Sequence, residues 1–273
     1  EQFIEDNSLY GVNADYFGEE EIARKFLTGA LPPMIQENLR ILTQFIKCPL
    51  AVRSSSILED SRVLPFAGIY KTYVVPNSHE DPEVRCRQLA DAVKLVYASV
   101  FYAAPVQYAR NADIRIEEEK MAVLIQELVG ETYGEHYFPA ISGVAQSYNF
   151  YPYEPMKPEE GTVSLALGLG KSIVEGEKVY RYSPAHPRMN PLVSSPAEYL
   201  QKSQNAFYAI NLRTTADIQL QADDSYGYER LPISRAEAEG ALEFVASTYS
   251  LEDECLYDGI NRRGPKVLTF API

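Results

Sequence analysis

The chain has 273 residues, which is long enough for one large domain or two lobes that bury a sizeable core. Its formal net charge of −13 argues against a nucleic-acid backbone as a partner. The three cysteines lie far apart and form neither a disulfide framework nor a zinc pattern, so we expect a reducing, cytoplasmic setting. We find no signal peptide and expect no membrane-spanning segment.

Helices are expected in the first part of the chain. Residues 1–18 show no clear period, so we expect a loop or linker there. A short helix begins at Glu19, where acidic residues favour the helix dipole, and ends at Gly29. Pro32-Pro33 restarts the chain, and a second helical period then follows from Ile35 to Ile46.

The stretch 49–76 carries the most informative residues. An apolar run at 50–52 predicts a buried strand, and Arg53 and the hydroxyls of Ser54–Ser56 follow it directly. A small-residue turn at Gly68 then leads into a second strand. An arginine, hydroxyls and a glycine turn between two strands suit an anion, most simply a phosphate. A salt bridge between the arginine and an aspartate, with solvated serines, explains the same residues.

The remaining elements alternate between helix and strand. Asp81 and Pro82 predict the start of a long helix that continues to Val100. Residues 121–129 are nearly all apolar, which is typical of a strand buried on both faces. Further strands are expected at 141–150, 162–167, 178–182 and 266–270, and capping boxes predict helices that open at Ser195 and at Ser234, the second continuing through Val245.

Several short segments occur in one consistent order and spacing. They are Val52-Arg53-Ser54-Ser55, Glu59-Asp60, Phe66-Ala67-Gly68, Thr72, Ile125 to Val129, Ser142-Gly143-Val144 and Gly168-Leu169-Gly170. Together they resemble the N-terminal nucleotide-binding domain of phosphoenolpyruvate synthase and pyruvate phosphate dikinase, a relative of the ATP-grasp fold. The resemblance implies an α/β (α+β) fold with two lobes, 1–118 and 119–273, and ATP with Mg²⁺ in the cleft between them.

The resemblance also implies roles for individual residues. Arg53 would hold the β- or γ-phosphate and stabilise its charge during transfer, and the turn at Gly68 would cover it. The strand end from Gln126 to Val129 would hold adenine, although an ordinary core strand accounts equally well for its hydrophobicity. The candidate nucleotide-binding residues are Arg53, Ser54, Ser55, Gly68, Thr72, Gln126, Glu127, Leu128, Val129 and Lys171.

The chain departs from the family pattern at several points. Lys171 stands where the family has an acidic residue near the metal; a lysine can contact phosphate but cannot ligate Mg²⁺. We find no glycine-glycine-lysine segment before Arg53 and no acidic strand of the I-E-W-A type. No metal ligand can therefore be named. The carrier histidine is also missing, because His79, His136 and His186 do not fit its pattern.

We expect the chain to be a piece of a longer protein, since it begins without methionine and ends on an apolar segment. The leading function is the ATP-binding part of a dikinase-like phosphotransferase. The resemblance implies that ATP phosphorylates a histidine on a swivelling domain, and that the phosphate then passes to pyruvate on a further domain; this chain alone would be inactive. The alternative is a non-catalytic nucleotide-sensing module that regulates an attached domain, and Lys171 favours it.

Overall fold

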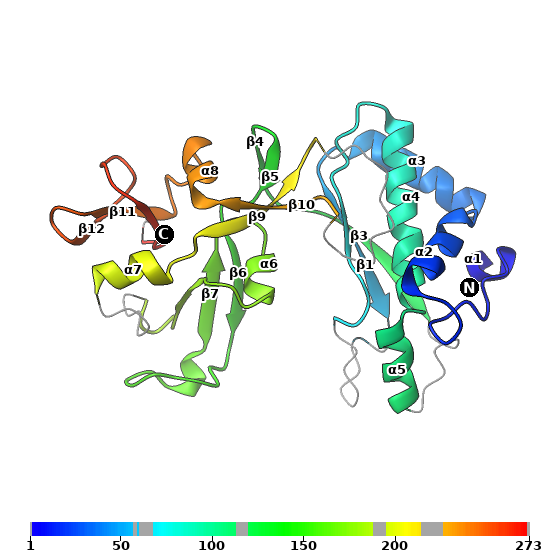
Figure 1. The fold of residues 1–273 in the computed structure, drawn as a ribbon, viewed down its shortest axis with the longest axis horizontal. Helices are drawn as coiled ribbons and strands as arrows, with labels where there is room; N and C mark the ends of the chain where they lie inside the picture. Colours follow the sequence, from blue (N-terminus) through cyan, green and yellow to red (C-terminus); the bar gives the residue numbers. More distant parts are fainter. Residues whose placement is uncertain are drawn as a thin grey trace. The chain divides into compact units, whose positions relative to one another are not determined.

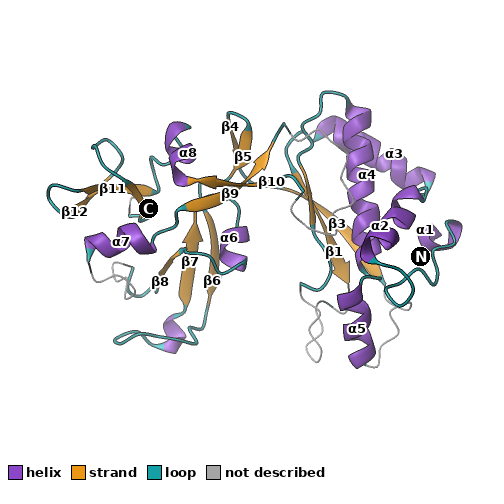
Figure 2. Cartoon of the chain, viewed as in Figure 1, coloured by secondary structure: helices purple, strands orange, loops and turns teal. Residues whose placement is uncertain are grey.

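The structure, a computed structural model, describes residues 2–56, 59, 68–112, 120–187, 195–213 and 226–271. By its contacts the chain divides into two units, which Figures 1 and 2 show as ribbons. Unit 1 comprises Glu1–Leu128 and Asn211–Tyr228, and unit 2 comprises Val129–Ile210 and Glu229–Ile273. Each unit is described by itself. The mixture of helices and antiparallel strands confirms the α+β class.

Unit 1 is built on a small antiparallel sheet. Its central strand β1 (Leu50–Ser56) pairs with β2 (Tyr73–Val75) on one side and with β3 (Met121–Glu127) on the other. The long helix α4 (Pro82–Ser99) runs alongside this sheet (Figure 1). The other helices are α1 (Gln2–Asp6), α2 (Glu19–Thr28), α3 (Pro33–Phe45) and α5 (Ala103–Asn111), of which α2 and α3 pack against α4.

Helix α4 begins as its sequence predicts and lies at the centre of the unit 1 core. The Asp81 carboxylate accepts a hydrogen bond of 2.9 Å from the Glu83 amide, and Pro82 occupies the first helical position. Together, α4 and α5 have the length and composition of a membrane span. However, 72% of the relevant window is buried within the protein, as in the core helix of a globular unit.

Two predictions for unit 1 are wrong. Residues 2–6 form α1, whose Phe3 packs its ring 6.0 Å from that of Phe26 in the core. Strand β3 is not buried on both faces: Val123 and Ile125 pack against the core, whereas Leu124 on the other face remains 43% exposed. The sequence could not show this difference because both faces of the strand carry apolar residues.

Unit 2 contains three small sheets, with strand orders β10-β9-β5-β4, β6-β7-β8 and β12-β11-β13. The strands are β4 (Glu131–Tyr133), β5 (His136–Phe138), β6 (Ser142–Gln146), β7 (Thr162–Ala166), β8 (Tyr180–Tyr182), β9 (Ala206–Asn211), β10 (Tyr228–Pro232), β11 (Ala246–Ser250), β12 (Cys255–Asp258) and β13 (Lys266–Leu268). The helices are α6 (Lys171–Val174), α7 (Pro196–Lys202) and α8 (Ile233–Ala238), with a single turn of 3-10 helix at Pro158–Glu160. The core is aromatic at its centre, where the rings of Phe138 and Phe207 lie 4.8 Å apart.

Most local predictions for unit 2 are confirmed, and one is wrong. Strands β6, β7, β8 and β13 lie where they were expected, and the Ser195 hydroxyl caps α7 by accepting from the Glu198 amide. The second capping box does not open a helix, because α8 has already begun at Ile233 and ends at Ala238. Gly240, with φ of +76°, follows the helix end, and Val245 is buried from a turn instead of a helix face.

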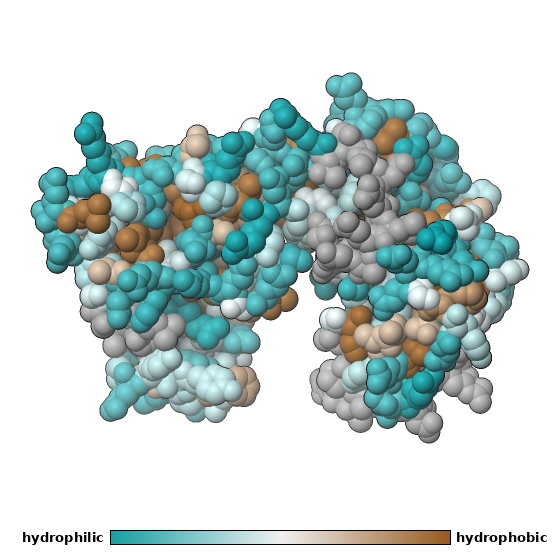
Figure 3. Space-filling model, viewed as in Figure 1, coloured by the Kyte–Doolittle hydropathy of each residue, from teal (hydrophilic) through white to brown (hydrophobic). Residues whose placement is uncertain are grey.

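Hydrophilic residues dominate the visible face of both units in Figure 3. The apolar residues on that face lie in separate small groups instead of one continuous band. This distribution agrees with a chain whose charged residues make up 23% of its sequence.

Candidate functional site

The predicted phosphate-binding arginine lies on the open face of the unit 1 sheet. In the β1–β3 pairing, Arg53 is opposite Leu124, and Ala51 is opposite Gln126. Directly paired residues share a face, so Arg53, Leu124 and Gln126 all lie on the face away from α4. The neighbouring Val52 faces the core and is fully buried. The alternation of the strand therefore brings Arg53 and Gln126, which are far apart in the sequence, to the same surface.

A carboxylate holds the two serines that point the other way. The Ser54 hydroxyl donates to Glu59 Oε1 at 2.7 Å, and the Ser56 amide donates to Glu59 Oε2 at 2.9 Å. The Glu59 amide in turn donates to the Ser56 hydroxyl at 3.3 Å. Glu59 thus anchors the chain that leaves β1, while Asp60 lies outside the described residues. Sequence analysis found Glu59 only as part of a matching pair and did not predict this function.

Arg53 is exposed and remains available for a ligand. Among the described residues, none accepts a hydrogen bond or forms an ion pair with its guanidinium. The salt-bridge alternative has no partner among the described residues, and Asp60, the nearby aspartate, lies outside them. Ser55, which shares the open face with Arg53, is exposed as well.

Arg53 borders an open cavity of about 400 Å³, which lies within the usual size range of ligand sites. Ser54, Ser55, Ser56, Glu59, Gly68 and Leu124 also line it. Gly68 has φ of +76°, a conformation that favours glycine, and a Cβ added there would meet no described atom within 4 Å. Arg53 is the one positively charged group in the described lining, and Ser55 is the serine that shares its face of the strand. An anion with several acceptor oxygens fits such a lining.

The predicted adenine strand has only part of its hydrogen-bonding capacity left. The Leu128 amide already donates to the Pro49 carbonyl at 2.9 Å, so it cannot also donate to adenine. Glu127 faces away from Gln126 and accepts from the Cys48 thiol at 3.4 Å. Val129 is 84% exposed and begins unit 2. Thr72 is half-buried and does not appear in the described lining of the Arg53 cavity.

Lys171 lies in unit 2, at the first residue of α6, and has partners there. Its Nζ is 3.3 Å from Glu175 Oε1 and 5.8 Å from the centre of the Tyr208 ring. The Tyr208 hydroxyl donates to Glu175 Oε2 at 2.7 Å, and this hydrogen bond is the main reason why the pKa of Tyr208 rises to about 12. The positive charge at position 171 is therefore balanced by a neighbouring carboxylate.

The described residues contain no group of three His, Cys, Asp or Glu side chains that could hold a metal ion. In the described lining of the Arg53 cavity, Glu59 is the carboxylate that could ligate a metal ion. Both of its oxygens already accept hydrogen bonds, one from the Ser54 hydroxyl and one from the Ser56 amide. The described residues do not fit a metal held by protein ligands alone.

A comparison with protein families shows to which family the chain belongs. Residues 11–237 match the family described as pyruvate phosphate dikinase, AMP/ATP-binding domain. The chain belongs to this family. The resemblance that the Arg53 and Gly168 segments carry is thereby confirmed, and the chain is an AMP/ATP-binding domain.

The curated relatives that are similar to this AMP/ATP-binding domain include the following two. One is the uncharacterized phosphotransferase YvkC of Bacillus subtilis, 27% identical over 180 residues, which are 64% of this chain and 18% of the relative. The other is a phosphoenolpyruvate synthase of Aeropyrum pernix, 27% identical over 184 residues, which are 64% of this chain and 20% of the relative. The chain thus spans about a fifth of the length of these relatives.

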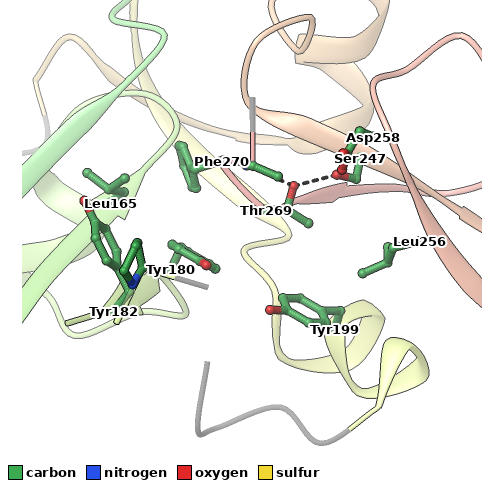
Figure 4. A pocket seen from close by; sticks show the side chains of 11 residues that line it. Leu165, Tyr180, Tyr182, Tyr199, Ser247, Leu256, Asp258, Thr269 and Phe270 are labelled. Atoms are coloured by element: carbon green, nitrogen blue, oxygen red, sulfur yellow. Dashed lines mark hydrogen bonds between the residues drawn. The ribbon is translucent and has the colours of Figure 1, made fainter. Parts of the chain in front are cut away.

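Unit 2 has a second, larger cavity of about 650 Å³, shown in Figure 4. Tyr180, Tyr182 and Phe270 line one side, and Tyr199 of α7 and Leu256 lie across from them. The hydroxyls of Ser247 and Thr269 form a hydrogen bond of 2.6 Å between themselves. Much of this lining lies beyond residue 237, outside the range that matches the family.

Proposed function

We propose that the Arg53 cavity binds the phosphates of ATP, with Arg53 as the charged contact and Ser55 beside it. The observation that supports this most directly is an exposed arginine that has no acceptor among the described residues, in a cavity whose lining includes serines. A phosphate oxygen that accepts from Arg53 adds a charge-assisted hydrogen bond and breaks none within the described residues. Gly68 covers the phosphates from the adjacent turn, and the strand end at Gln126–Val129 contacts adenine.

We propose further that this domain works inside a longer, dikinase-like phosphotransferase. ATP bound here phosphorylates a carrier histidine on another domain, and the phosphate then passes to pyruvate. Mg²⁺ enters this proposal as the ion that accompanies ATP. The ATP-grasp type of fold and the division into lobes at 118/119 belong to the same proposal. The names of the relatives, a phosphotransferase and a phosphoenolpyruvate synthase, agree with it.

The binding proposal is tested by calorimetry with Mg-ATP on this chain and two variants. Arg53→Gln removes the charge, and the matched control Arg24→Gln removes an exposed arginine on α2, which packs on the other side of α4. Loss of a charge-assisted hydrogen bond costs about 1.5–3 kcal/mol, so we expect Arg53→Gln to bind ATP about 10- to 100-fold more weakly. Equal affinities for Arg53→Gln and the wild type would remove Arg53 from the site.

A second candidate function is a non-catalytic nucleotide sensor, and the environment of Lys171 favours it. Lysine cannot ligate Mg²⁺, and Glu175 lies 3.3 Å from its ammonium group. A sensor would bind ATP at Arg53 without passing phosphate to a histidine. Incubation of the full-length protein with labelled ATP separates the two functions. Acid-labile phosphoprotein supports the phosphotransferase, and intact ATP with no labelled protein supports the sensor.

A further inference from the structure

Unit 2 has a third and smaller cavity, of about 70 Å³, which the nucleotide proposal does not use. It lies where the loop after β6 meets the end of β8. Asn149, Tyr151 and Tyr153 of the loop line it, together with Arg181 and Ser183 at the end of β8. The volume is too small for a nucleotide and suits a group of a few heavy atoms.

Ser183 is the first indication that this cavity binds something. The residue is 2% exposed, and its hydroxyl has no hydrogen-bond partner among the described residues. Only the backbone of Ser183 is engaged, since its carbonyl accepts from the His186 amide at 2.9 Å. Buried hydroxyls in folded proteins nearly always find a partner, so an unpartnered one beside a cavity calls for a ligand atom.

Two further polar side chains in the described lining, Asn149 and Arg181, present hydrogen-bond donors to the cavity. The Asn149 side-chain oxygen accepts from the Tyr151 amide at 3.0 Å, so the Asn149 NH₂ group is left to donate elsewhere. Arg181 makes one contact among the described residues, a long 3.4 Å bond from Nε to the Ser164 hydroxyl. Its two terminal nitrogens are left to donate.

No carboxylate is present in the described lining of this cavity, although the chain carries a net charge of −13. Three acids are close to it in the sequence. Glu154 and Glu159 are exposed and are not part of the described lining, and Glu160 already contacts His186 at 3.3 Å and accepts from the Lys157 amide at 2.9 Å. A guanidinium, an amide NH₂ and a hydroxyl without a competing acid are typical of a site for an oxyanion.

We infer that this cavity is a binding site for a small tetrahedral oxyanion of phosphate size, separate from the Arg53 cavity. Arg181 supplies the charge, and Asn149 and Ser183 donate hydrogen bonds to the remaining oxygens. The shared chemistry is a phosphate group, whether it is free or at the end of a larger molecule. Tyr151, which is 83% exposed, leaves space for a substituent beyond the phosphate.

The test measures saturable binding of sodium phosphate and sodium sulfate by calorimetry and thermal shift, with sodium chloride at equal ionic strength as reference. We expect phosphate and sulfate to raise the melting temperature and chloride to leave it unchanged. Arg181→Gln should weaken phosphate binding about ten-fold or more, the effect of losing a charge-assisted hydrogen bond. Arg230→Gln removes an exposed arginine of unit 2 outside this cavity and should bind phosphate like the wild type.

Ser183→Ala separates a binding role from a structural one. Because the hydroxyl has no partner in the protein, its removal should leave the melting temperature without phosphate unchanged or higher, while phosphate binding weakens. Arg53→Gln should leave phosphate binding at this site unchanged. Glycerol 3-phosphate then distinguishes the sources: binding as tight as phosphate indicates a terminal phosphate group, and weaker binding indicates the free ion.

Three results would overturn the inference. The first is an equal response to chloride and phosphate. The second is an equal loss of phosphate binding in Arg181→Gln and Arg230→Gln. The third is a Ser183→Ala protein that is less stable but binds phosphate normally.

Discussion

Replacement of Gly168 by alanine tests how the glycine-rich segment before Lys171 is held in place. Gly168 has φ of +80°, where an L-residue is strained by roughly 1–2 kcal/mol. A Cβ there would lie 2.6 Å from the Tyr208 carbonyl oxygen and 2.7 Å from Phe207 Cδ2. Both are fixed parts of β9, so the two segments must move apart. The Leu169 amide, which donates to that same Tyr208 carbonyl at 2.8 Å, then loses a hydrogen bond.

The expected loss of stability is the sum of these effects. Backbone strain of about 1–2 kcal/mol and a lost hydrogen bond of about 0.5–1.5 kcal/mol give about 1.5–3.5 kcal/mol for Gly168→Ala. Gly176→Ala is the matched control, because Gly176 has φ of +70° and no atom within 4 Å of the added carbon. Gly176→Ala should therefore lose only the stability that backbone strain costs, about 1–2 kcal/mol. Urea unfolding followed by circular dichroism measures both variants, and equal losses would refute the steric argument.

Two further predictions concern chemistry and pH. When this chain is incubated with labelled ATP and pyruvate, neither phosphoenolpyruvate nor labelled protein should form above background. The reason is that the chain shows a candidate for the nucleotide site alone. Formation of phosphoenolpyruvate would mean that the location of the acceptor site has been misjudged. Burial, followed by the hydrogen bond to Glu127, raises the pKa of the Cys48 thiol from 9.0 to about 11. The folded state therefore holds the thiol proton more tightly than the unfolded state, so this group's stabilisation is present below pH 9 and is lost as pH rises towards 11. Cys48→Ala should remove that part of the pH dependence of the unfolding free energy, and identical curves for the variant and the wild type would refute it.

Local signals in the sequence predicted the parts of the fold that neighbouring residues determine. Asp81 and Pro82 fix the start of α4 by a hydrogen bond and a ring that suits the first helical turn. The strand β11, by contrast, is set by its pairing with the two strands that flank it, β12 and β13. Its Thr248 is opposite Tyr257 on one side and Lys266 on the other. A short polar strand such as β11 gives no periodic signal, so the sequence could not predict it.

The residues of the candidate site also divide into those that the local sequence could group and those that only strand geometry brings together or separates. The sequence placed Arg53 and the serines in one group, because they are adjacent. The strand separates them: Ser54 and Ser56 turn to Glu59, and Ser55 stays with Arg53. Leu124 joins the lining only through strand pairing, which no local pattern reveals. The role of Lys171 also depends on Glu175, one helical turn further along the chain.

The two candidate phosphate contacts should contribute unequally to ATP affinity. Arg53 has no acceptor among the described residues, so an ATP phosphate adds an ion pair there without breaking one. The charge of Lys171 is already partly neutralised by Glu175, so a phosphate contact there adds less net free energy than one at Arg53. We therefore expect Lys171→Gln to weaken ATP binding less than Arg53→Gln. Calorimetry on both variants measures the two losses, with Lys202→Gln, another lysine of unit 2 that pairs with a glutamate four residues away, as control. A larger loss in Lys171→Gln would mean that the pair with Glu175 opens in the complex and that the main phosphate contact lies in unit 2.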